Sequence, residues 1–265
     1  MDFSAKLHQA WRRSASRLCV GLDPFMEKIP ARFTAGPRPI LAFNKWIIDQ
    51  VGDLVCAFKP QHAHHAALAA EADLAETIAY IRSRQPHVLI ILDAKRGDIG
   101  STADLYAREA FDRYDADAVT VNPYMGDDSV LPFLTRPDRG AVVLCRTSNP
   151  DAGRIQSLPA GNQPLFAAIA ERAQTVWNAN RNVMLVVGAT APADMKIVRA
   201  AAPTLPFLVP GIGEQGGSIA DVLSAGRTAD GQGLVVSASR SVLYAGDADQ
   251  VRAAALAARD LLACG

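Results

Sequence analysis

Four charged residues fall within six positions directly after an apolar run at residues 88–92, in the segment "VLIILDAKRGDIGST". If the run is a β-strand, Asp93 and Lys95 are two positions apart and point to the same side. Asp98 lies beyond the strand, on the turn that follows it. A second lysine, Lys59, ends the separate apolar run "VCAFK". The four residues can therefore form an array of alternating charge in one place.

Such an array suits electrostatic chemistry and proton transfer. A close pair of opposite charges is worth on the order of 4 kcal/mol at an effective dielectric near about 20, before desolvation is subtracted. Neighbouring carboxylates favour the protonated form of a lysine, so Lys95 is predicted to be a proton donor; a Schiff-base lysine needs a lowered pKa instead. The alternative is a structural ion-pair network at the rim of the fold. Arg96 alternates away from Lys95, and we assign it only surface or rim pairing.

A glycine-rich segment, "VPGIGEQGGSIADVLSAG", follows another apolar run and precedes a predicted helix. Gly211, Gly213 and Gly216 match the GxGxxG pattern of dinucleotide-binding folds by letter, but that fingerprint opens a first strand–helix unit, whereas this one opens the seventh. Backbone N–H groups after a seventh strand suit the phosphate site of (β/α)8 barrels. Gln215 and Arg240, which ends the eighth run, could then hold the phosphate. The alternative is a tight turn beside an arginine that caps a helix.

Three further polar segments have two interpretations each. Ser148 in "RTSNP" could hydrogen-bond a ligand amide or start a turn, and Asp23 in "GLDP" could bind sugar hydroxyls or cap a helix. The segment "QHAHH" at residues 61–65 has no Cys or carboxylate at ligand spacing. We therefore interpret it as a loop or a helix start rather than a metal site.

Most of these residues end or follow short apolar runs that recur along the whole chain, at residues 18–23, 54–59, 88–93, 118–122, 141–146, 183–188, 207–211 and 233–239. Ala-rich stretches such as residues 65–84 and 162–181 carry apolar positions three and four apart, and an amphipathic helix is expected before the first run. Runs that are apolar on both faces and alternate with helices indicate buried parallel strands. Eight such units predict an α/β fold, a (β/α)8 TIM barrel that spans residues 1–265 as a single domain. An open doubly wound sheet is the alternative.

The amino-acid composition limits the kinds of partner that the protein can be expected to bind. Lys+Arg and Asp+Glu are equal at 27 each, which argues against a nucleic-acid surface or a polybasic membrane surface but leaves room for a local anion pocket. No apolar run approaches the roughly 18 residues of a membrane span, and the first residues lack the apolar core of a signal peptide. The four cysteines form no CxxC pair, which suggests reduced thiols in a cytoplasmic protein.

In this combination and order, the motifs resemble the orotidine 5'-phosphate decarboxylase family, and in particular its longer bacterial branch. "DAKRGDI" has the D-x-K-x-x-D pattern of that family, and "GLDP", "AFKP", "TSNP", "PGIG" with "EQGG", and "SASR" accompany it from the first strand to the eighth. The resemblance implies a homodimeric barrel that converts orotidine 5'-monophosphate (OMP) to UMP and CO2, the last step of pyrimidine nucleotide synthesis, with no cofactor and no metal.

The resemblance also implies roles for individual residues. Lys95 would protonate C6 of the pyrimidine, and Asp98, Ile99 and Thr102 would complete the active site of the partner subunit. The charged catalytic network would be Lys59, Asp93, Lys95 and Asp98. The other substrate contacts would be Asp23, Lys59 and Thr102 to the ribose, Ser148 to the pyrimidine amide, and Pro210, Gly211, Gly213, Gln215 and Arg240 around the phosphate. Some family members place a Tyr just after the phosphate-loop Gln, whereas Gly216 and Gly217 follow here.

Three other functions stay open at this point. A sugar-phosphate aldolase such as hexulose-phosphate synthase belongs to the same barrel group and would need Mg2+. A dehydrogenase would bind its dinucleotide at the glycine-rich segment. A non-catalytic nucleotide-binding barrel would bind UMP without releasing CO2.

Overall fold

The structure is a computed structural model that describes residues 1–212 and 218–263. Eight parallel strands close into a barrel in the order β1-β10-β9-β8-β5-β4-β3-β2, which confirms the predicted (β/α)8 architecture. Each of the eight predicted apolar runs overlaps one of these strands. Their bounds are β1 Leu18–Leu22, β2 Ala57–Pro60, β3 Leu89–Arg96, β4 Ala118–Val121, β5 Gly140–Arg146, β8 Val183–Val187, β9 Phe207–Val209 and β10 Leu234–Ala238.

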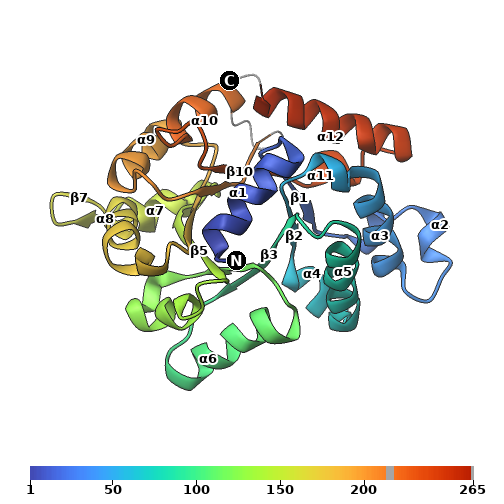
Figure 1. Cartoon of the computed structure of the whole chain (residues 1–265), viewed down its shortest axis with the longest axis horizontal. Helices are drawn as coiled ribbons and strands as arrows, with labels where there is room; N and C mark the ends of the chain where they lie inside the picture. The colour runs from blue at the N-terminus through green and yellow to red at the C-terminus, as the bar shows by residue number, and fades with distance from the viewer. Residues whose placement is uncertain (213–217, 264–265) are drawn as a thin grey trace.

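Helices surround the barrel on its outside (Figure 1). The longer ones are α1 Phe3–Ser14, α3 Pro39–Val51, α5 Glu71–Arg84, α6 Gly100–Arg108, α8 Leu165–Arg172, α9 Pro192–Ala201, α10 Ile219–Gly226 and α12 Ala248–Ala263. Four short helices are α2 Ala31–Thr34, α4 His62–Ala66, α7 Gly153–Gln156 and α11 Arg240–Leu243. In the long loop after β5, β6 Pro159–Ala160 and β7 Gln163–Pro164 form an antiparallel hairpin.

Two stretches predicted as single helices are interrupted in the structure. The first contains α4 and α5, separated by a turn in which Ala69 has a φ of 51°. Tertiary packing sets this break, because the buried His65 of α4 is hydrogen-bonded to Asn44 of α3. In the second stretch, α8 continues as a π-helix at Ala173–Trp177 and a 3-10 turn at Asn178–Asn180.

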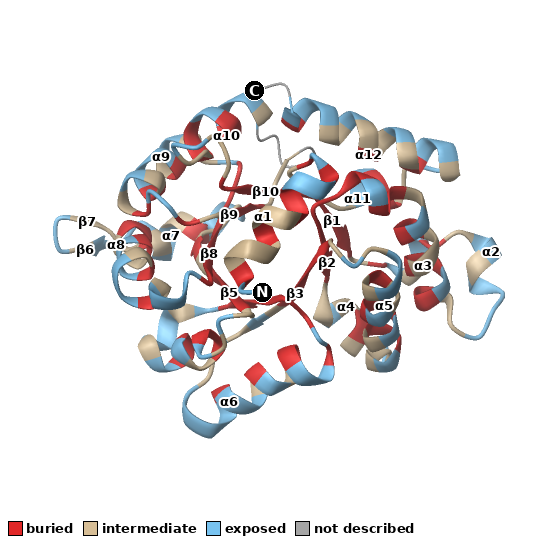
Figure 2. Cartoon of the chain, in the orientation of Figure 1, coloured by how far each residue is buried: buried red, intermediate tan, exposed pale blue. Residues whose placement is uncertain are grey.

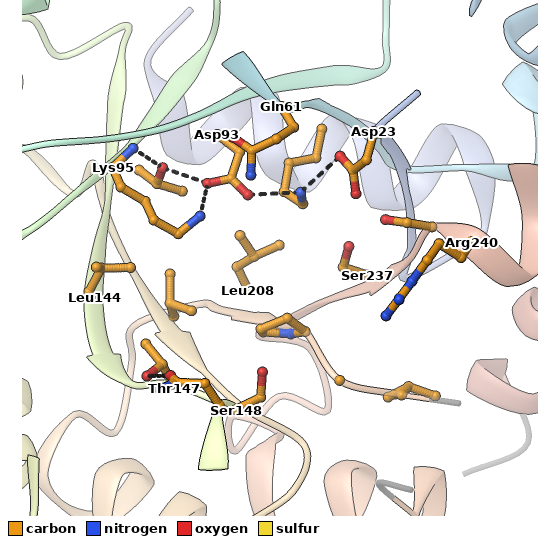
Figure 3. Close-up of a pocket in the computed structure, with 18 of the residues that line it drawn as sticks. Asp23, Gln61, Asp93, Lys95, Leu144, Thr147, Ser148, Leu208, Ser237 and Arg240 are labelled. Atoms are coloured by element: carbon orange, nitrogen blue, oxygen red, sulfur yellow. Dashed lines mark hydrogen bonds and ion pairs between the residues drawn. The ribbon is translucent and has the colours of Figure 1, made fainter. Parts of the chain in front are cut away.

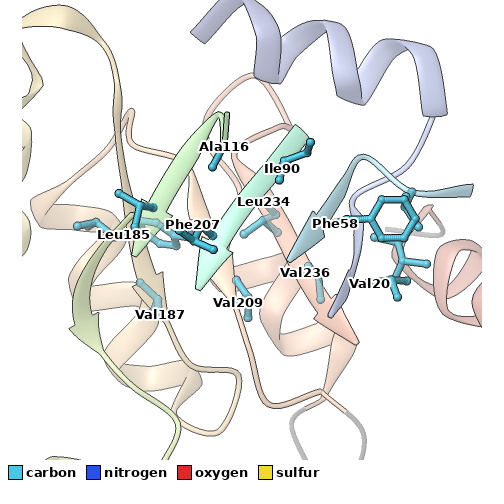
Figure 4. Packing of buried hydrophobic residues seen from close by; sticks show 14 of the residues in the cluster. Val20, Phe58, Ile90, Ala116, Leu185, Val187, Phe207, Val209, Leu234 and Val236 are labelled. Atoms are coloured by element: carbon cyan, nitrogen blue, oxygen red, sulfur yellow. The ribbon is translucent and has the colours of Figure 1, made fainter. Parts of the chain in front are cut away.

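Strand residues alternate between two apolar layers, as the period of a β-strand requires. One set faces outward and packs under the helices, as Figure 4 shows for Val20, Phe58 and Ile90. The other set faces the barrel interior and includes Cys19, Ile91 and apolar residues of the other strands. Figure 2 shows the same division, with the strands buried and the outer faces of the helices exposed. Because both faces are covered, the strands read as continuous apolar runs in the sequence.

Helix α1 covers one end of the barrel (Figure 1). Phe3, Leu7 and Trp11 are buried in the same cluster as the barrel-interior residues. The Trp11 indole Nε1 donates a hydrogen bond to the carbonyl of Leu234 at the start of β10, over 3.0 Å. These contacts lie at the amino ends of the strands, so α1 leaves the opposite, carboxyl end of the barrel free for a site.

Among the described residues, no helix is both long enough and apolar enough to cross a membrane. Cys19, Cys56 and Cys145 are buried free thiols, as predicted from their apolar surroundings. Burial raises the pKa of Cys19 to about 12, so this thiol stays protonated at neutral pH. Cys264 lies outside the described residues.

The packing of α1 predicts a large effect of truncating one residue. Leu7 is 1% exposed, so Leu7→Ala should lower the free energy of unfolding by about 2–5 kcal/mol, measured by urea denaturation. The matched control is Leu261→Ala on α12, where the side chain is 58% exposed. The control should change stability by no more than about 0.5 kcal/mol. Equal effects of the two changes would contradict the conclusion that α1 is packed over the amino end of the barrel.

Candidate active site

A cavity of about 480 Å³ opens at the carboxyl ends of the barrel strands (Figure 3). Its size falls in the range of pockets that enclose small ligands, roughly 300–1,000 Å³. The wall combines charged and hydroxyl groups with a few apolar side chains. It is formed by Asp23, Lys59, Gln61, Asp93, Lys95, Thr120, Leu144, Thr147, Ser148, Asn149, Gln156, Val186, Leu208, Pro210, Gly211, Ile212, Ser237, Ser239, Arg240 and Ser241.

The inward positions of the strands continue from the apolar interior into this cavity. On β3, Leu89 and Ile91 belong to the interior cluster and the next inward position is Asp93. On β2 the inward Ala57 is followed by Lys59, and on β4 the inward Ala118 is followed by Thr120. One alternation therefore builds the core and then, one step further along each strand, the polar floor of the site.

Asp93 stands at the centre of a charged array. Its Oδ2 accepts a hydrogen bond from Lys59 Nζ at 2.9 Å, and its Oδ1 accepts one from Lys95 Nζ at 2.7 Å. Lys59 Nζ also lies 3.7 Å from Asp23 Oδ1. Figure 3 shows the Lys95 side chain beside the Asp93 carboxylate, with Asp23 on the other side. The structure thus brings together Lys59, Asp93 and Lys95 of the predicted four-residue array, but the second acid near Lys59 is Asp23, and Asp98 does not line the cavity of its own chain.

Burial alone would favour the neutral forms of Lys59 and Asp93. For Lys59 this desolvation is outweighed by the charges of Asp23 and Asp93 and by the hydrogen bond to Asp93, so its pKa lies above the ordinary value. For Asp93 the desolvation is outweighed by Lys59 and Lys95, and its pKa is held well below the usual range for a carboxyl. Both groups are therefore charged at neutral pH. Lys95 differs in exposure, because half of its side chain is accessible while that of Lys59 is buried.

The backbone around Lys95 is not the regular strand that the spacing suggested. Leu92 pairs with Val119 and Arg96 pairs with Val121, so β3 bulges between these two pairs. At the bulge Lys95 has a φ of 46°, in the left-handed region. This conformation costs a residue other than glycine about 1–2 kcal/mol. Strain of this kind persists where neighbouring groups hold it, and it collects at functional sites.

Arg96 lies beside this bulge and is paired, as predicted, away from the cavity. Its guanidinium donates to both carboxylate oxygens of Glu109, at 3.0 and 2.7 Å. His62 Nε2 lies 3.4 Å from the same carboxylate. The histidine-rich segment forms the short helix α4, in agreement with its interpretation as a helix start. Among the described residues, no group of three His, Cys, Asp or Glu side chains is arranged to hold a metal ion.

Asp23 supplies an oxygen that is ready to accept a hydrogen bond. Its Oδ1 is buried and accepts no hydrogen bond from any described residue, although Lys59 Nζ lies within ion-pair distance. Buried carboxylate oxygens are normally satisfied, so this one suits a ligand hydroxyl. The strand end that carries Asp23 is held by Tyr244, whose hydroxyl donates to the Asp23 carbonyl at 3.3 Å and accepts from Phe25 N at 2.8 Å.

Ser148, predicted to contact the base, and Arg240, predicted to contact the phosphate, lie across the cavity from Asp93 (Figure 3). Ser148, Pro210, Gly211 and Arg240 all contribute to the wall. Gly188 allows the Ser148 segment to approach closely, because a Cβ at position 188 would lie 2.7 Å from Ser148 Cα. Two further predicted phosphate residues, Gly213 and Gln215, lie outside the described residues.

Three predicted residues do not contribute to the cavity wall of their own chain: Asp98, Ile99 and Thr102. Asp98 Oδ1 accepts a hydrogen bond from Ile99 N at 2.8 Å, and Ile99 is 48% exposed. Thr102 is exposed on α6. Asp98 therefore does not join Lys59, Asp93 and Lys95 in the cavity of its own chain, as the spacing had suggested.

Sequence reasoning missed several residues of the wall. They are Gln61, Thr120, Gln156, Ser237 of β10, the following Ser239 and Ser241, and the apolar Leu144, Val186 and Leu208. The signal for several of them was present. Counting in steps of two from an inward core residue reaches Thr120, Leu144 and Ser237. Gln156 had no such signal, because its contact with Thr147 N at 2.9 Å depends on how the loop after β5 folds back.

The charge of Asp93 predicts how stability depends on pH. Because its folded pKa is depressed, the unfolded chain binds more protons in acid, and the stabilisation present above the ordinary carboxyl pKa is lost as pH falls below it. Asp93→Asn should lower the unfolding free energy at pH 7, and the gap between the two curves should narrow progressively as pH falls below about 5.

The measurement is urea denaturation at several pH values. Asp151→Asn is the control, because the Asp151 side chain is 75% exposed, and it should follow the wild type throughout. A constant gap between wild type and Asp93→Asn down to pH 3 would contradict the depressed pKa.

Comparisons with known proteins agree with this geometry. The family "Orotidine 5'-phosphate decarboxylase / HUMPS" matches residues 16–255. The chain is 53% identical to orotidine 5'-phosphate decarboxylase of Cellvibrio japonicus over 259 residues, which cover 97% of this chain and 95% of that protein. It is 50% identical to the same enzyme of Ralstonia nicotianae, covering 98% and 97% of the two chains. The solved structure of Leishmania donovani OMP decarboxylase matches with a TM-score of 0.87 and 42% identity, over 99% of this chain and 97% of that one. The chain belongs to the orotidine 5'-phosphate decarboxylase / HUMPS family, and its curated relatives carry the name of the carboxy-lyase.

Proposed function

We propose that this protein decarboxylates OMP to UMP and CO2, the final step of UMP biosynthesis, without a cofactor. The observation that carries the proposal is the Lys59–Asp93–Lys95 array on the floor of the cavity, in a chain of this family. Lys95 is the proton donor of the proposal because its ammonium group is both fixed by Asp93 and accessible.

The proposed reaction uses only groups of the chain itself. The bond between C6 and the carboxylate carbon breaks, CO2 leaves, and the electron pair remains on C6. A proton from Lys95 Nζ then bonds to C6, and solvent returns a proton to the lysine. A fixed ammonium beside the developing carbanion lowers the barrier, because preorganised charge does not have to reorient during the reaction. Asp93 would hold both ammonium groups and lie next to the carboxylate that departs.

The rest of the cavity fits the remainder of the nucleotide. Asp23 and Lys59 would bind ribose hydroxyls, which is supported by the buried Asp23 oxygen that accepts no hydrogen bond from a described residue. Ser148 would bind the pyrimidine amide. Pro210, Gly211, Gly213, Gln215 and Arg240 would surround the phosphate. Binding energy from this remote group can be used to order the site around the reacting carbon.

A homodimer completes the proposed site. Asp98, Ile99 and Thr102 would enter the cavity of the partner subunit, and their absence from the cavity wall of their own chain supports this arrangement. Exposed apolar side chains lie around α6 and the adjoining segments, namely Leu105, Tyr124, Met125 and Leu131. Such a patch on one face is typical of a subunit interface. The proposal also places the protein in the cytoplasm, where its buried free thiols would stay reduced.

Removing the proton donor should abolish turnover. Lys95→Ala should lower kcat by at least about 10³-fold, because both the acid and the charge beside C6 are lost. The measurement is the change in ultraviolet absorbance as OMP is consumed, with and without EDTA. EDTA should not change the wild-type rate. A magnesium-dependent aldolase of the same family would not consume OMP, and EDTA would inhibit it.

The control is Lys196→Ala, an exposed lysine on α9 that should leave kcat unchanged. Lys95→Ala should also keep its folding transition and its affinity for UMP, so that loss of turnover is not loss of structure. If this variant retained a tenth or so of wild-type kcat, Lys95 would not be the proton donor.

Mixing two inactive variants tests the shared site. In a Lys95→Ala/Asp98→Ala heterodimer, one site carries both lesions and the other carries none. Random exchange of subunits should therefore restore about a quarter of wild-type activity, since about half of the dimers are mixed and each has one intact site of two. Activity should be followed after mixing the separately purified variants. No recovery, with subunit exchange verified by mass spectrometry, would contradict completion of the site by the partner.

A further inference from the structure

We infer that Thr120 is a positioning residue that fixes both Asp93 and the backbone of Lys95 through a single hydroxyl group. The inference deepens the proposed decarboxylation and rests on it for its kinetic consequence. Thr120 lies on β4, is 1% exposed and faces inward at the floor of the cavity. It is named in none of the sequence motifs.

The hydroxyl of Thr120 makes three hydrogen bonds at once. It donates to Asp93 Oδ1 at 2.9 Å, and it accepts from Lys95 N at 2.8 Å and from Ala94 N at 3.0 Å. A hydroxyl has one proton and two lone pairs, so these contacts use its full capacity. The group therefore serves the protein's own chain rather than a substrate.

The two accepted bonds hold the bulge of β3. Lys95 adopts its left-handed φ of 46° at the point where β3 loses regular pairing with β4. In a regular strand the N–H groups of consecutive residues point to opposite neighbours, so β4 would accept from only one of the two. At the bulge the Thr120 hydroxyl accepts from both Ala94 N and Lys95 N, and the Cα–Cβ direction of Lys95 depends on these hydrogen bonds. The direction of that bond sets where Nζ can reach.

The donated bond fixes the carboxylate between the two lysines. Asp93 Oδ1 accepts from Thr120 Oγ1 and from Lys95 Nζ, while Oδ2 accepts from Lys59 Nζ. With three donors in place, rotation of the carboxylate would break at least one strong contact. The Thr120 hydroxyl thus holds both the Asp93 carboxylate, which orients the Lys95 ammonium, and the backbone of Lys95 itself.

A purely space-filling role for Thr120 predicts a different outcome. Its inward neighbour on the strand is Ala118, and the barrel interior beneath Thr120 is apolar. Valine has nearly the shape of threonine and would fill the same volume, so filling alone requires no hydroxyl. A methyl in place of the hydroxyl would instead leave the Ala94 and Lys95 N–H groups without their acceptor.

The test compares Thr120→Val, which removes the hydroxyl, with Thr120→Ser, which keeps it. Thr120→Val should lower kcat about 10- to 100-fold, because a small misplacement of a catalytic group has an effect of this size. KM should change less than about threefold, since the phosphate and base contacts lie across the cavity. Thr120→Ser should recover kcat to within about threefold of wild type.

Thr77→Val on α5 is the matched control, because Thr77 is also buried and its hydroxyl also accepts a hydrogen bond, from Asn44 Nδ2. It should change stability without changing kcat. Amide hydrogen exchange, followed residue by residue, gives a second readout that does not involve catalysis. The amides of Ala94 and Lys95 should exchange faster in Thr120→Val than in wild type or in Thr120→Ser, while core amides of the same strand keep their protection.

The outcomes separate this inference from the proposed function. If the wild type does not release CO2 from OMP, the proposed function fails, and the exchange rates of the two amides still decide whether Thr120 holds the bulge. If the wild type is active but Thr120→Val equals it in kcat, the positioning role is wrong. Unchanged exchange at Ala94 and Lys95 in Thr120→Val would also overturn it.

Discussion

The structure of the site depends on one carboxylate that is hydrogen-bonded to two ammonium groups. Asp93 is buried, and so is Lys59; neither charge would be stable in that position without the other. Removing one partner of such a pair leaves an uncompensated buried charge, which is far more costly than the pair itself is stabilising. The array therefore behaves as a unit. Its geometry is fixed before any ligand arrives, which is the condition for electrostatic preorganisation.

The barrel makes this arrangement possible through the alternation of its strands. Every second residue faces the interior, and α1 with apolar side chains fills that interior from the amino ends upward. Where the apolar filling ends, the same inward positions carry Lys59, Asp93 and Thr120. The charges thus lie on a close-packed apolar base, which excludes water beneath them and keeps the local dielectric low. The apolar core and the charged site are therefore built from successive inward-facing positions of the same strands.

The sequence predicted the eight strands and the grouping of Lys59, Asp93 and Lys95, because burial on both faces and charges at strand ends leave direct traces in residue order. It placed Asp98 in the same array, whereas the acid near Lys59 in the structure is Asp23. It did not predict the left-handed Lys95. That conformation depends on the hydroxyl of Thr120, 25 positions further along the chain and visible only once β3 and β4 are paired. The break at Ala69 was missed for the same reason, since it follows from the contact between His65 and Asn44 rather than from local propensity. The roles of the site residues toward a substrate remain predictions.

The contact of Trp11 with Leu234 has a consequence for the order in which the protein can assemble during translation. The first helix packs on the last strand, and β1 pairs with β10, so both contacts join opposite ends of the chain. The ribosome must release β10 before α1 can complete its packing. Until then the apolar side chains of Phe3, Leu7 and Trp11 are not fully covered on the nascent chain. Chaperones bind exposed apolar segments of this kind. Ring closure is therefore a late event, and the indole of Trp11 is a natural fluorescent reporter of it.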